Sequence, residues 1–335
     1  MVKSLDFEQP VASLESAMTK LEQEAEKHPS PQTSERLEQA RLEWLDGLKA
    51  LYAGLTAWQT VQVARHPDRP HADDIISAMC DDFVELRGDR TYSDDAAMLG
   101  GIARLGERVV MVLGHRKGHT TKQNVARNFG MPHPEGYRKA RRLMGQAAKF
   151  GMPLVCLLDT PAAASSLTAE ERGQSWALAD NLTTMATLQV PILVTVIGEG
   201  GSGGALAIGV GDRLLMLEHA IYSVASPEAC ASIVWKDAKH APDAAEALQL
   251  TAPDLARLGV ADRLVSEPVG GAHRDPGAAA ETLQAALGEE LDRLCQVPLP
   301  ELLERRYQRL RQWGPFLDGD GTGPPADGAF AQSAP

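Results

Sequence analysis

Glycine is concentrated in one short stretch of the chain, VPILVTVIGEGGSGGALAIGVG at residues 190–211. The apolar, β-branched run at 192–197 predicts a buried strand of an α/β sheet, and the small apolar residues at 205–209 predict a tightly packed helix. A strand, a glycine-rich turn and a helix start leave several N–H groups without acceptors, and the helix dipole favours negative charge there. The stretch therefore predicts a main-chain pocket for a phosphate or an oxyanion. Its five central glycines are Gly198, Gly200, Gly201, Gly203 and Gly204.

The same spacing also fits the dinucleotide-binding fingerprint G-x-G-x-x-G. Gly198, Gly200 and Gly203 match its glycines, and Glu218 follows where the fingerprint places an acid. That fingerprint belongs to the first strand of its fold, whereas predicted strands precede residue 192 in this chain. We therefore favour an oxyanion site and keep a nicotinamide-dependent oxidoreductase as the alternative from another class.

The flanking sequence predicts the elements that position this stretch. Residues 99–105 and 108–114 are predicted to form a hairpin, and residues 154–159 a buried strand. Alternating strands and helices predict an α/β domain. Further strands are predicted at 213–217, 221–224 and 263–265, and helices at 134–150, 170–188, 279–294 and 300–313.

The main domain is predicted to span residues 61–295, with extensions at both ends. Two amphipathic helices around a proline-containing break predict a helical hairpin at 1–60, which we expect to pack on a partner or on itself. A C-terminal helix is expected at 296–314. The tail at 315–335 is rich in Gly, Pro and Asp, so we expect it to be disordered.

Composition excludes several classes of function. The net charge of −12 argues against general affinity for nucleic acid or anionic membranes, and no apolar run is long enough for a membrane span. The N-terminus lacks the apolar core of an export signal, so a cytoplasmic protein is expected. The four cysteines are far apart and predict neither disulfides nor a zinc site; they are Cys80, Cys156, Cys230 and Cys295.

Basic residues are concentrated between positions 116 and 142 of this acidic chain. They could steer or hold a polyanionic substrate, or form a solvated helix face with salt bridges, and the sequence leaves both interpretations open. His115 and His119 are four residues apart but have no evident third ligand, so no metal site is expected. The basic residues are Arg116, Lys117, Lys122, Arg127, Arg138, Lys139, Arg141 and Arg142.

Several longer motifs carry a family resemblance. They are IGEGGSGGALAIGVGD, NFGMPHPEGYRKARRLM, AEERGQS, SPEACASIVWK, GGAHRDP and RRYQRL, with LDFEQPV near the start and RHPDRP before the main domain. Together they resemble the α subunit of bacterial acetyl-CoA carboxylase carboxyltransferase, in order and over about residues 4–312. The resemblance implies a crotonase-like α/β fold, a superhelix of ββα units.

The resemblance also implies an activity and partners. The family transfers a carboxyl group from carboxybiotin on a carrier protein to acetyl-CoA, which gives malonyl-CoA, the first step of fatty acid synthesis. It works as an α2β2 assembly with a zinc-carrying β subunit, alongside the biotin carboxyl carrier protein and biotin carboxylase. We therefore expect no cofactor bound covalently to this chain and zinc only on the β subunit.

By the same resemblance, the backbone N–H groups of Gly203 and Gly204 form an oxyanion hole for the ureido oxygen of biotin. Such donors stabilise developing charge without having to reorganise, and glycine leaves room for a close approach. A second oxyanion hole, for the acetyl-CoA enolate, is expected on the β subunit. The residues expected to contact substrate are Gly200, Gly201, Lys117, Arg116, Thr160, Pro161 and Ala162.

One loop departs from the family pattern. After the strand that ends at Asp159 the family typically has DTPGAYPGVGAEERGQ, whereas this chain has DTPAAASSLTAEERGQ. If a lost glycine had a positive φ, its replacement costs about 1 kcal/mol or the loop follows another path. A specialised or inactive paralogue, acting on another acyl-CoA or regulating the β subunit, is therefore the main alternative. The replacements are Ala162, Ala164, Ser165, Ser166 and Thr168.

Overall fold

A single mixed β-sheet lies at the centre of the computed structural model, which describes residues 3–314. Its strand order is β1-β2-β3-β4-β5-β6-β8, and β7 extends the sheet by pairing with the end of β5. The strands are β1 (Asp81–Glu85), β2 (Met98–Leu105), β3 (Arg108–His115), β4 (Leu154–Thr160), β5 (Ile192–Gly201), β6 (Arg213–Leu217), β7 (Ile221–Ser223) and β8 (Arg263–Val265).

The strands predicted from hydrophobic pattern are present. β2 and β3 form the expected antiparallel hairpin, with Gly106 at a φ of +57° in its turn. From β3 onward the neighbouring strands run parallel. Every residue of β4 is buried, as the continuous apolar sequence of a strand covered on both faces requires. The carboxyl ends of β4 and β5 therefore meet at one edge of the sheet.

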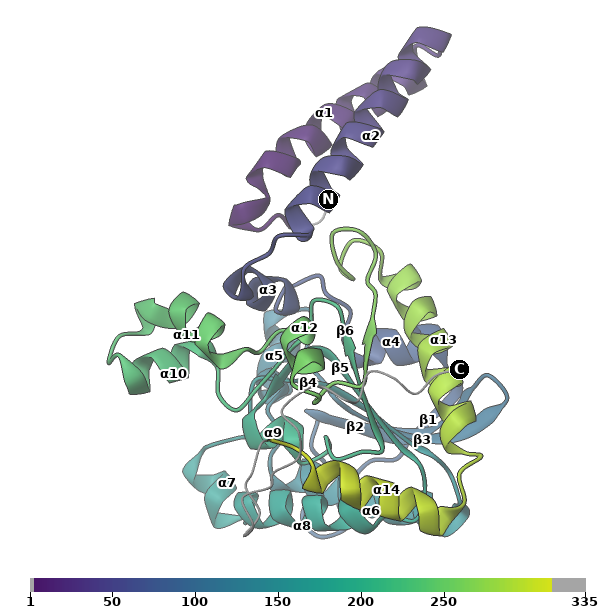
Figure 1. Ribbon diagram of the computed structural model, residues 1–335, viewed down its shortest axis with the longest axis vertical. Coiled ribbons are helices and arrows are strands. Elements are labelled where there is room, and N and C mark those ends of the chain that lie inside the picture. Colours follow the sequence, from purple (N-terminus) through teal and green to yellow (C-terminus); the bar gives the residue numbers. More distant parts are fainter. Residues whose placement is uncertain (1–2, 315–335) are drawn as a thin grey trace, which may run out of the picture.

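Helices cover both faces of the sheet (Figure 1). α6, α8 and α14 lie side by side on one face, while α13 packs on α4 and on strands β5 and β8. The single helix expected over 170–188 is two helices, because Gly173 adopts a φ of +80° before the second. The covering helices are α4 (Ala72–Met79), α6 (Pro134–Phe150), α7 (Leu167–Glu171), α8 (Gln174–Thr187), α13 (Pro276–Leu294) and α14 (Leu299–Arg311).

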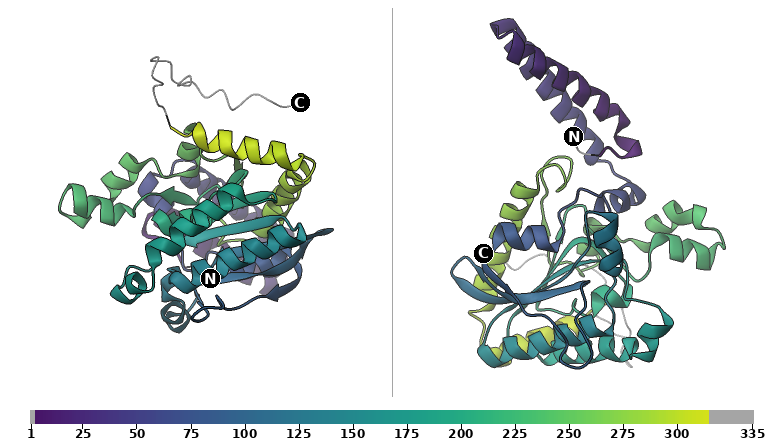
Figure 2. Two further views of the ribbon diagram at one scale, coloured as in Figure 1. Left: turned by 90° about the horizontal axis from the view of Figure 1, so that it is seen from below. Right: turned by 180° about the vertical axis from the view of Figure 1, so that it is seen from behind.

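The N-terminal helices form a long hairpin that projects from the rest of the molecule (Figures 1 and 2). η1 (Asp6–Glu8), α1 (Gln9–Lys27) and α2 (Pro31–Tyr52) make up this arm, and Ser30 caps the second long helix. At its base Arg274 pairs with Glu8 at 3.0 Å. The boundary expected at residue 60 falls inside α3 (Ala57–Ala64). The predicted disordered tail lies outside the described residues.

Several short elements were not predicted, because each has eight residues or fewer and apolar patterns of that length are ambiguous in sequence. In the described part of the chain, no helix is long and apolar enough to cross a membrane. α10 and α11 pack together and protrude beside α3 (Figure 1). The remaining elements are α5 (Thr121–Ala126), η2 (Asn128–Gly130), α9 (Ser202–Leu206), α10 (Pro227–Val234), η3 (Ala238–His240), α11 (Ala241–Leu248) and α12 (Ala252–Arg257).

Candidate active site

The glycine-rich stretch is mostly strand, which corrects the predicted turn. β5 continues through the first three of the five glycines: Gly200 pairs with Thr160 of β4 and with Tyr222 of β7. The expected loop of bare amides is therefore absent at these positions. Glycine suits this extended backbone because the absence of a side chain lets the neighbouring backbone segment approach closely. A Cβ at Gly201 would lie only 1.9 Å from the carbonyl oxygen of Pro161.

The chain turns abruptly from β5 into α9 at Ser202. This residue has a φ of +53°, an unusual conformation for a side chain other than glycine, asparagine or aspartate. Gly203 and Gly204 follow in the first turn of α9, where N–H groups have no acceptor in their own helix. A left-handed residue followed by helical residues orients successive N–H groups into a concave anion-binding site. The strained residue thus lies where strain commonly serves function.

The loop after β4 packs directly against this junction. A Cβ at Gly204 would lie 2.4 Å from the carbonyl carbon of Ala162 and 2.4 Å from the nitrogen of Ala163. Only glycine can therefore occupy position 204 with the loop in its present place. Gly203 differs, because a Cβ there would meet only Leu178 of α8, at an ordinary 3.6 Å. Seven of the nine predicted site residues gather here: Gly200, Gly201, Gly203, Gly204, Thr160, Pro161 and Ala162.

The altered loop is not strained. Within this described loop none of residues 162–168 has a positive φ, so the non-glycine residues cost no left-handed strain. Thr160 closes a small turn, since its Oγ1 donates to the carbonyl of Ala162 at 2.7 Å. The loop is held further along by a bond of 3.0 Å from the Ala164 N–H to the Pro132 carbonyl. The free-energy cost expected for a non-glycine residue at a positive φ therefore does not arise in this loop.

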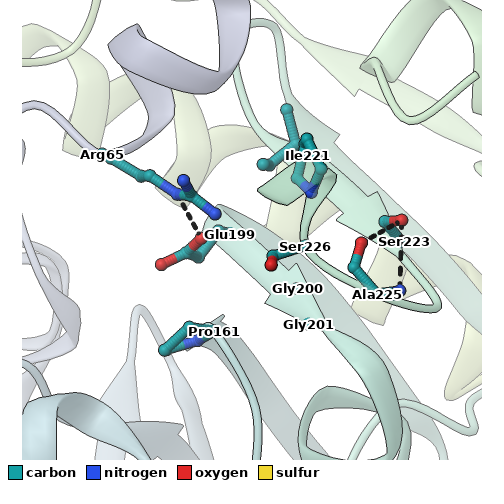
Figure 3. Close-up of a pocket in the computed structure, with 10 residues that line it drawn as sticks. Arg65, Pro161, Glu199, Gly200, Gly201, Ile221, Ser223, Ala225 and Ser226 are labelled. Atoms are coloured by element: carbon teal, nitrogen blue, oxygen red, sulfur yellow. Dashed lines mark hydrogen bonds and ion pairs between the residues drawn. The ribbon is translucent and has the colours of Figure 1, made fainter. Parts of the chain in front are cut away.

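A small hollow opens beside the end of β5 (Figure 3). Pro161 lies on one side of it, Gly200 and Gly201 form its floor, and Arg65 and Glu199 lie at the other end. Arg65 Nε donates to Glu199 Oε2 at 2.7 Å, so the two charges at the hollow are paired. The rest of the lining comes from β7 and the start of α10, namely Ile221, Ser223, Ala225, Ser226 and Pro227.

Lys117 belongs to a buried ion cluster that includes Glu199 of this hollow. Its Nζ is 2.8 Å from Asp159 Oδ1 and 3.0 Å from Glu199 Oε1. Despite burial, these two carboxylates keep the pKa of Lys117 above its usual value, and the ammonium in turn lowers the pKa values of both carboxyl groups. The cluster ties the ends of β4 and β5 together. The Lys117 ammonium is therefore paired with carboxylates of its own chain, and it holds together the strands that carry the site.

The other predicted cations are also paired. Arg116 contacts Asp73 at 2.8 Å and Glu85 at 3.1 Å, which uses its guanidinium within the chain. These contacts favour the salt-bridge interpretation of the basic cluster over a free cationic surface. Carboxylate partners are present for most of its remaining members, namely Arg127, Arg138, Lys139 and Arg141.

His115 and Tyr137 were not predicted to belong to the site. His115 is fully buried, its Nε2 lies 3.2 Å from the Gly204 carbonyl oxygen, and the Tyr137 hydroxyl donates to the same oxygen at 3.1 Å. His119 instead pairs with Asp74. Among residues 3–314, no group of three or more His, Cys, Asp or Glu side chains is placed to hold a metal ion.

The geometry does not support the dinucleotide fingerprint. Gly198 and Gly200 lie inside β5 and not in a turn after a first strand. Glu218 accepts a hydrogen bond of 3.0 Å from the backbone N–H of Glu267. Besides His115 and Tyr137, sequence reasoning missed Arg65, Asp159 and Glu199. The available signal for these three was a charged residue at the end of an apolar strand or helix.

Comparisons with known proteins identify the family of this chain. Residues 4–314 match the family described as acetyl co-enzyme A carboxylase carboxyltransferase-like. The chain is 53% identical over 312 residues to the acetyl-coenzyme A carboxylase carboxyl transferase subunit alpha of Xanthomonas campestris pv. campestris strain B100, covering 93% of this chain and 98% of that protein. It is 52% identical over 312 residues to the same subunit of Stenotrophomonas maltophilia strain K279a, with the same coverage.

Solved structures share the fold at low sequence identity. The β subunit of Pseudomonas aeruginosa geranyl-CoA carboxylase aligns with a TM-score of 0.54 and 15% identity, over 76% of this chain and 45% of that one. A chain of the Pseudomonas malonate decarboxylase hetero-tetramer, solved with coenzyme A, aligns with a TM-score of 0.53 and 20% identity, over 65% of this chain and 90% of that one. These neighbours confirm the crotonase-like carboxyltransferase fold. The family match over residues 4–314 and the 53% identity to an α subunit show that the chain belongs to the acetyl-CoA carboxylase carboxyltransferase α-subunit family.

Proposed function

We propose that this chain is the α subunit of a carboxyltransferase that moves a carboxyl group from carboxybiotin to acetyl-CoA and so forms malonyl-CoA. Beyond family membership, the proposal is supported chiefly by one observation. The amides of Gly203 and Gly204 lie in the first turn of a helix that begins at the strained Ser202. Such an arrangement is suited to an oxygen that gains negative charge.

The residues present fit the ureido group of biotin. Carboxybiotin supplies the carboxyl group and an oxygen that becomes more negative when that group is released. Gly203 and Gly204 donate N–H groups to this oxygen, and their fixed positions avoid reorganisation during transfer. Pro161 and Ala162 border the approach to these amides, while the Lys117 cluster holds the strand ends together. Arg116 and Lys117 act by holding this frame, since both are paired within the chain.

The partners follow from the same proposal. The start of α10 lines the hollow, and this helix and the residues before it expose the apolar side chains of Val224, Ile233 and Val234. We expect the β subunit to cover this surface, to bring zinc and the second oxyanion hole, and to complete an α2β2 assembly. The biotin carboxyl carrier protein would deliver carboxybiotin to the shared site, after biotin carboxylase has loaded it. All of these steps are expected in the cytoplasm.

The altered loop supports a second candidate. Ala162, Ala163 and Ala164 place only methyl groups where the family loop carries a tyrosine, next to Gly204. A missing aromatic wall leaves more room beside the site, so a paralogue that accepts a larger acyl-CoA, or one that binds the β subunit without turnover, is the alternative.

Reconstitution distinguishes these candidates. The full chain is mixed with a β subunit, and malonyl-CoA-dependent carboxylation of biotin is measured, followed by the forward reaction with acetyl-CoA and longer acyl-CoAs. We expect transfer with acetyl-CoA. A preference for a longer acyl group, or assembly without transfer, would instead support the paralogue. Saturable binding of NAD(P)H by the chain would contradict the carboxyltransferase proposal altogether.

A further inference from the structure

The carbonyl group of Gly204 needs a hydrogen-bond donor that its own helix does not provide. α9 ends at Leu206, and the N–H of Ile208, which would reach Gly204 in a longer helix, donates to Ala205 at 3.2 Å. Gly204 is buried, and a buried carbonyl without a donor is strongly unfavourable. Two side chains from other parts of the fold supply the missing bonds.

These donors come from separate elements that converge on one atom. His115 is the last residue of β3, and Tyr137 lies in the first turn of α6. Their contacts to the Gly204 oxygen are 3.2 Å from Nε2 and 3.1 Å from the hydroxyl. Both side chains are fully buried, so neither bond competes with water. The oxygen is thereby held from two directions.

The proton positions in this arrangement are defined at neutral pH. His115 Nδ1 accepts from the backbone N–H of Asp159 at 3.4 Å, which leaves the proton on Nε2 for the Gly204 carbonyl. Burial lowers the pKa of His115 to about 4, so the ring is neutral at neutral pH. Burial also raises the pKa of Tyr137 well above its usual value, so its hydroxyl stays protonated.

We propose that Tyr137 and His115 are positioning residues that hold the Gly203–Gly204 amides in the orientation needed to receive a negative oxygen. Two consecutive glycines have more conformational freedom than any other pair, and a first helical turn offers their N–H groups no acceptor. Fixing the carbonyl of Gly204 fixes the peptide plane between Gly204 and Ala205, so the Gly204 N–H can turn only about the two backbone bonds of Gly204 itself. The Ala162–Ala163 backbone, which packs against Gly204, restricts that rotation. This inference rests on the proposed function, because it assigns a task to the same amides.

The first test is Tyr137→Phe, which removes one donor and keeps the ring. In the assembled complex with the β subunit, we expect kcat for malonyl-CoA-dependent carboxylation of biotin to fall about tenfold, with the KM for malonyl-CoA within twofold of wild type. Tyr52→Phe is the matched control. Tyr52 is also buried and loses a hydrogen bond, of 2.9 Å to Glu8, but it lies in the N-terminal hairpin. It should lower thermal stability and leave kcat unchanged.

A second pair of variants separates positioning from packing. His115→Gln keeps an N–H donor near the original Nε2, whereas His115→Met has similar size and no donor. Positioning predicts that kcat is at least fivefold higher for the Gln variant. A merely structural role predicts the reverse order, because a buried glutamine amide is harder to satisfy than a methionine. This comparison also decides the matter if Tyr137→Phe does not assemble.

Gly204→Ala distinguishes a failure of the positioning inference from a failure of the proposed function. If this variant loses transfer while Tyr137→Phe keeps the wild-type kcat and His115→Met equals or exceeds His115→Gln, the positioning inference is wrong and the proposed function stands. If the wild-type complex transfers no carboxyl group, or Gly204→Ala transfers it at the wild-type rate, the proposed function fails and the positioning inference fails with it.

Discussion

Replacing Gly204 with alanine should abolish most carboxyl transfer through steric displacement of the backbone. The new Cβ would lie 2.4 Å from Ala162 and Ala163 backbone atoms, whereas ordinary contact begins at 3.4 Å. Relief of this overlap requires a shift of about 1 Å, and displacement of that size at a reacting centre typically costs about 100-fold in rate. Loss of one oxyanion donor costs about 100- to 1,000-fold in kcat. We therefore expect kcat to fall by about 100-fold or more.

The assay is malonyl-CoA-dependent carboxylation of biotin by the complex with the β subunit, and assembly is checked by size-exclusion chromatography. Two alanine variants serve as controls. Gly203→Ala places its Cβ at an ordinary 3.6 Å from Leu178, so kcat should fall less than tenfold. Gly145→Ala lies on the exposed face of α6 with no heavy atom within 4 Å, and it should raise stability by about 0.5–1 kcal/mol without changing kcat.

The ranking of the three variants tests the reasoning. A fully active, assembled Gly204→Ala complex would refute both the contact with the loop and the oxyanion assignment. Equal losses for Gly203→Ala and Gly204→Ala would show that the loop contact does not set the effect. Loss of assembly in Gly204→Ala alone would place the residue at the subunit interface and contradict the expected split between kcat and folding.

Three other predictions concern the loop, the core and pH. Restoring the family loop should raise acetyl-CoA carboxylation in the reconstituted complex, and an unchanged or lower rate would mean the loop is adapted to another substrate. Arg306 is fully buried, bonds Asp212 at 2.7 Å and donates to three carbonyls, so Arg306→Met should lower the free energy of unfolding in urea by about 3–5 kcal/mol. The pKa of His115 is lowered to about 4, so its contribution is present above pH 6.5 and lost as pH falls through 4; wild type should lose about 2–3 kcal/mol more than His115→Gln between pH 7 and pH 4. The restored loop combines Ala162→Gly, Ala164→Tyr, Ser165→Pro and Ser166→Gly.

Local pattern was sufficient to predict the elements that carry the site. The apolar runs at 154–159 and 192–197 became β4 and β5, and the Pro134 helix start and Gly151 helix end are both present. Such features depend on neighbours in sequence, so they leave a signal there. The turn predicted at the end of β5 was wrong, because the conformation there depends on strands that are distant in sequence. Glycine predicts a turn locally, but pairing with β4 on one side and β7 on the other stabilises extended backbone.

Contacts between residues that are distant in the chain leave no comparable signal in the local sequence. Tyr137 reaches Gly204 across 67 residues and His115 across 89, so the sequence around either residue does not indicate its partner. Lys117 was predicted to contact substrate because it lies in the cluster of basic residues between positions 116 and 142. Its burial between Asp159 and Glu199 could only be seen once the strand ends were placed together.

The glycine-rich stretch therefore meets several structural requirements that composition alone does not separate. Gly201 and Gly204 let the loop after β4 approach to distances that no side chain permits, while Gly198 makes room for the Asp159 carboxylate, 2.4 Å from its Cβ position. Gly203 is under no such constraint, so its freedom matters only if something must approach its N–H group. If close packing were the only reason for glycine in this stretch, Gly203→Ala would change neither assembly nor kcat. A selective loss of kcat in that variant, however small, would therefore separate a catalytic requirement for glycine from a packing requirement within one turn of helix.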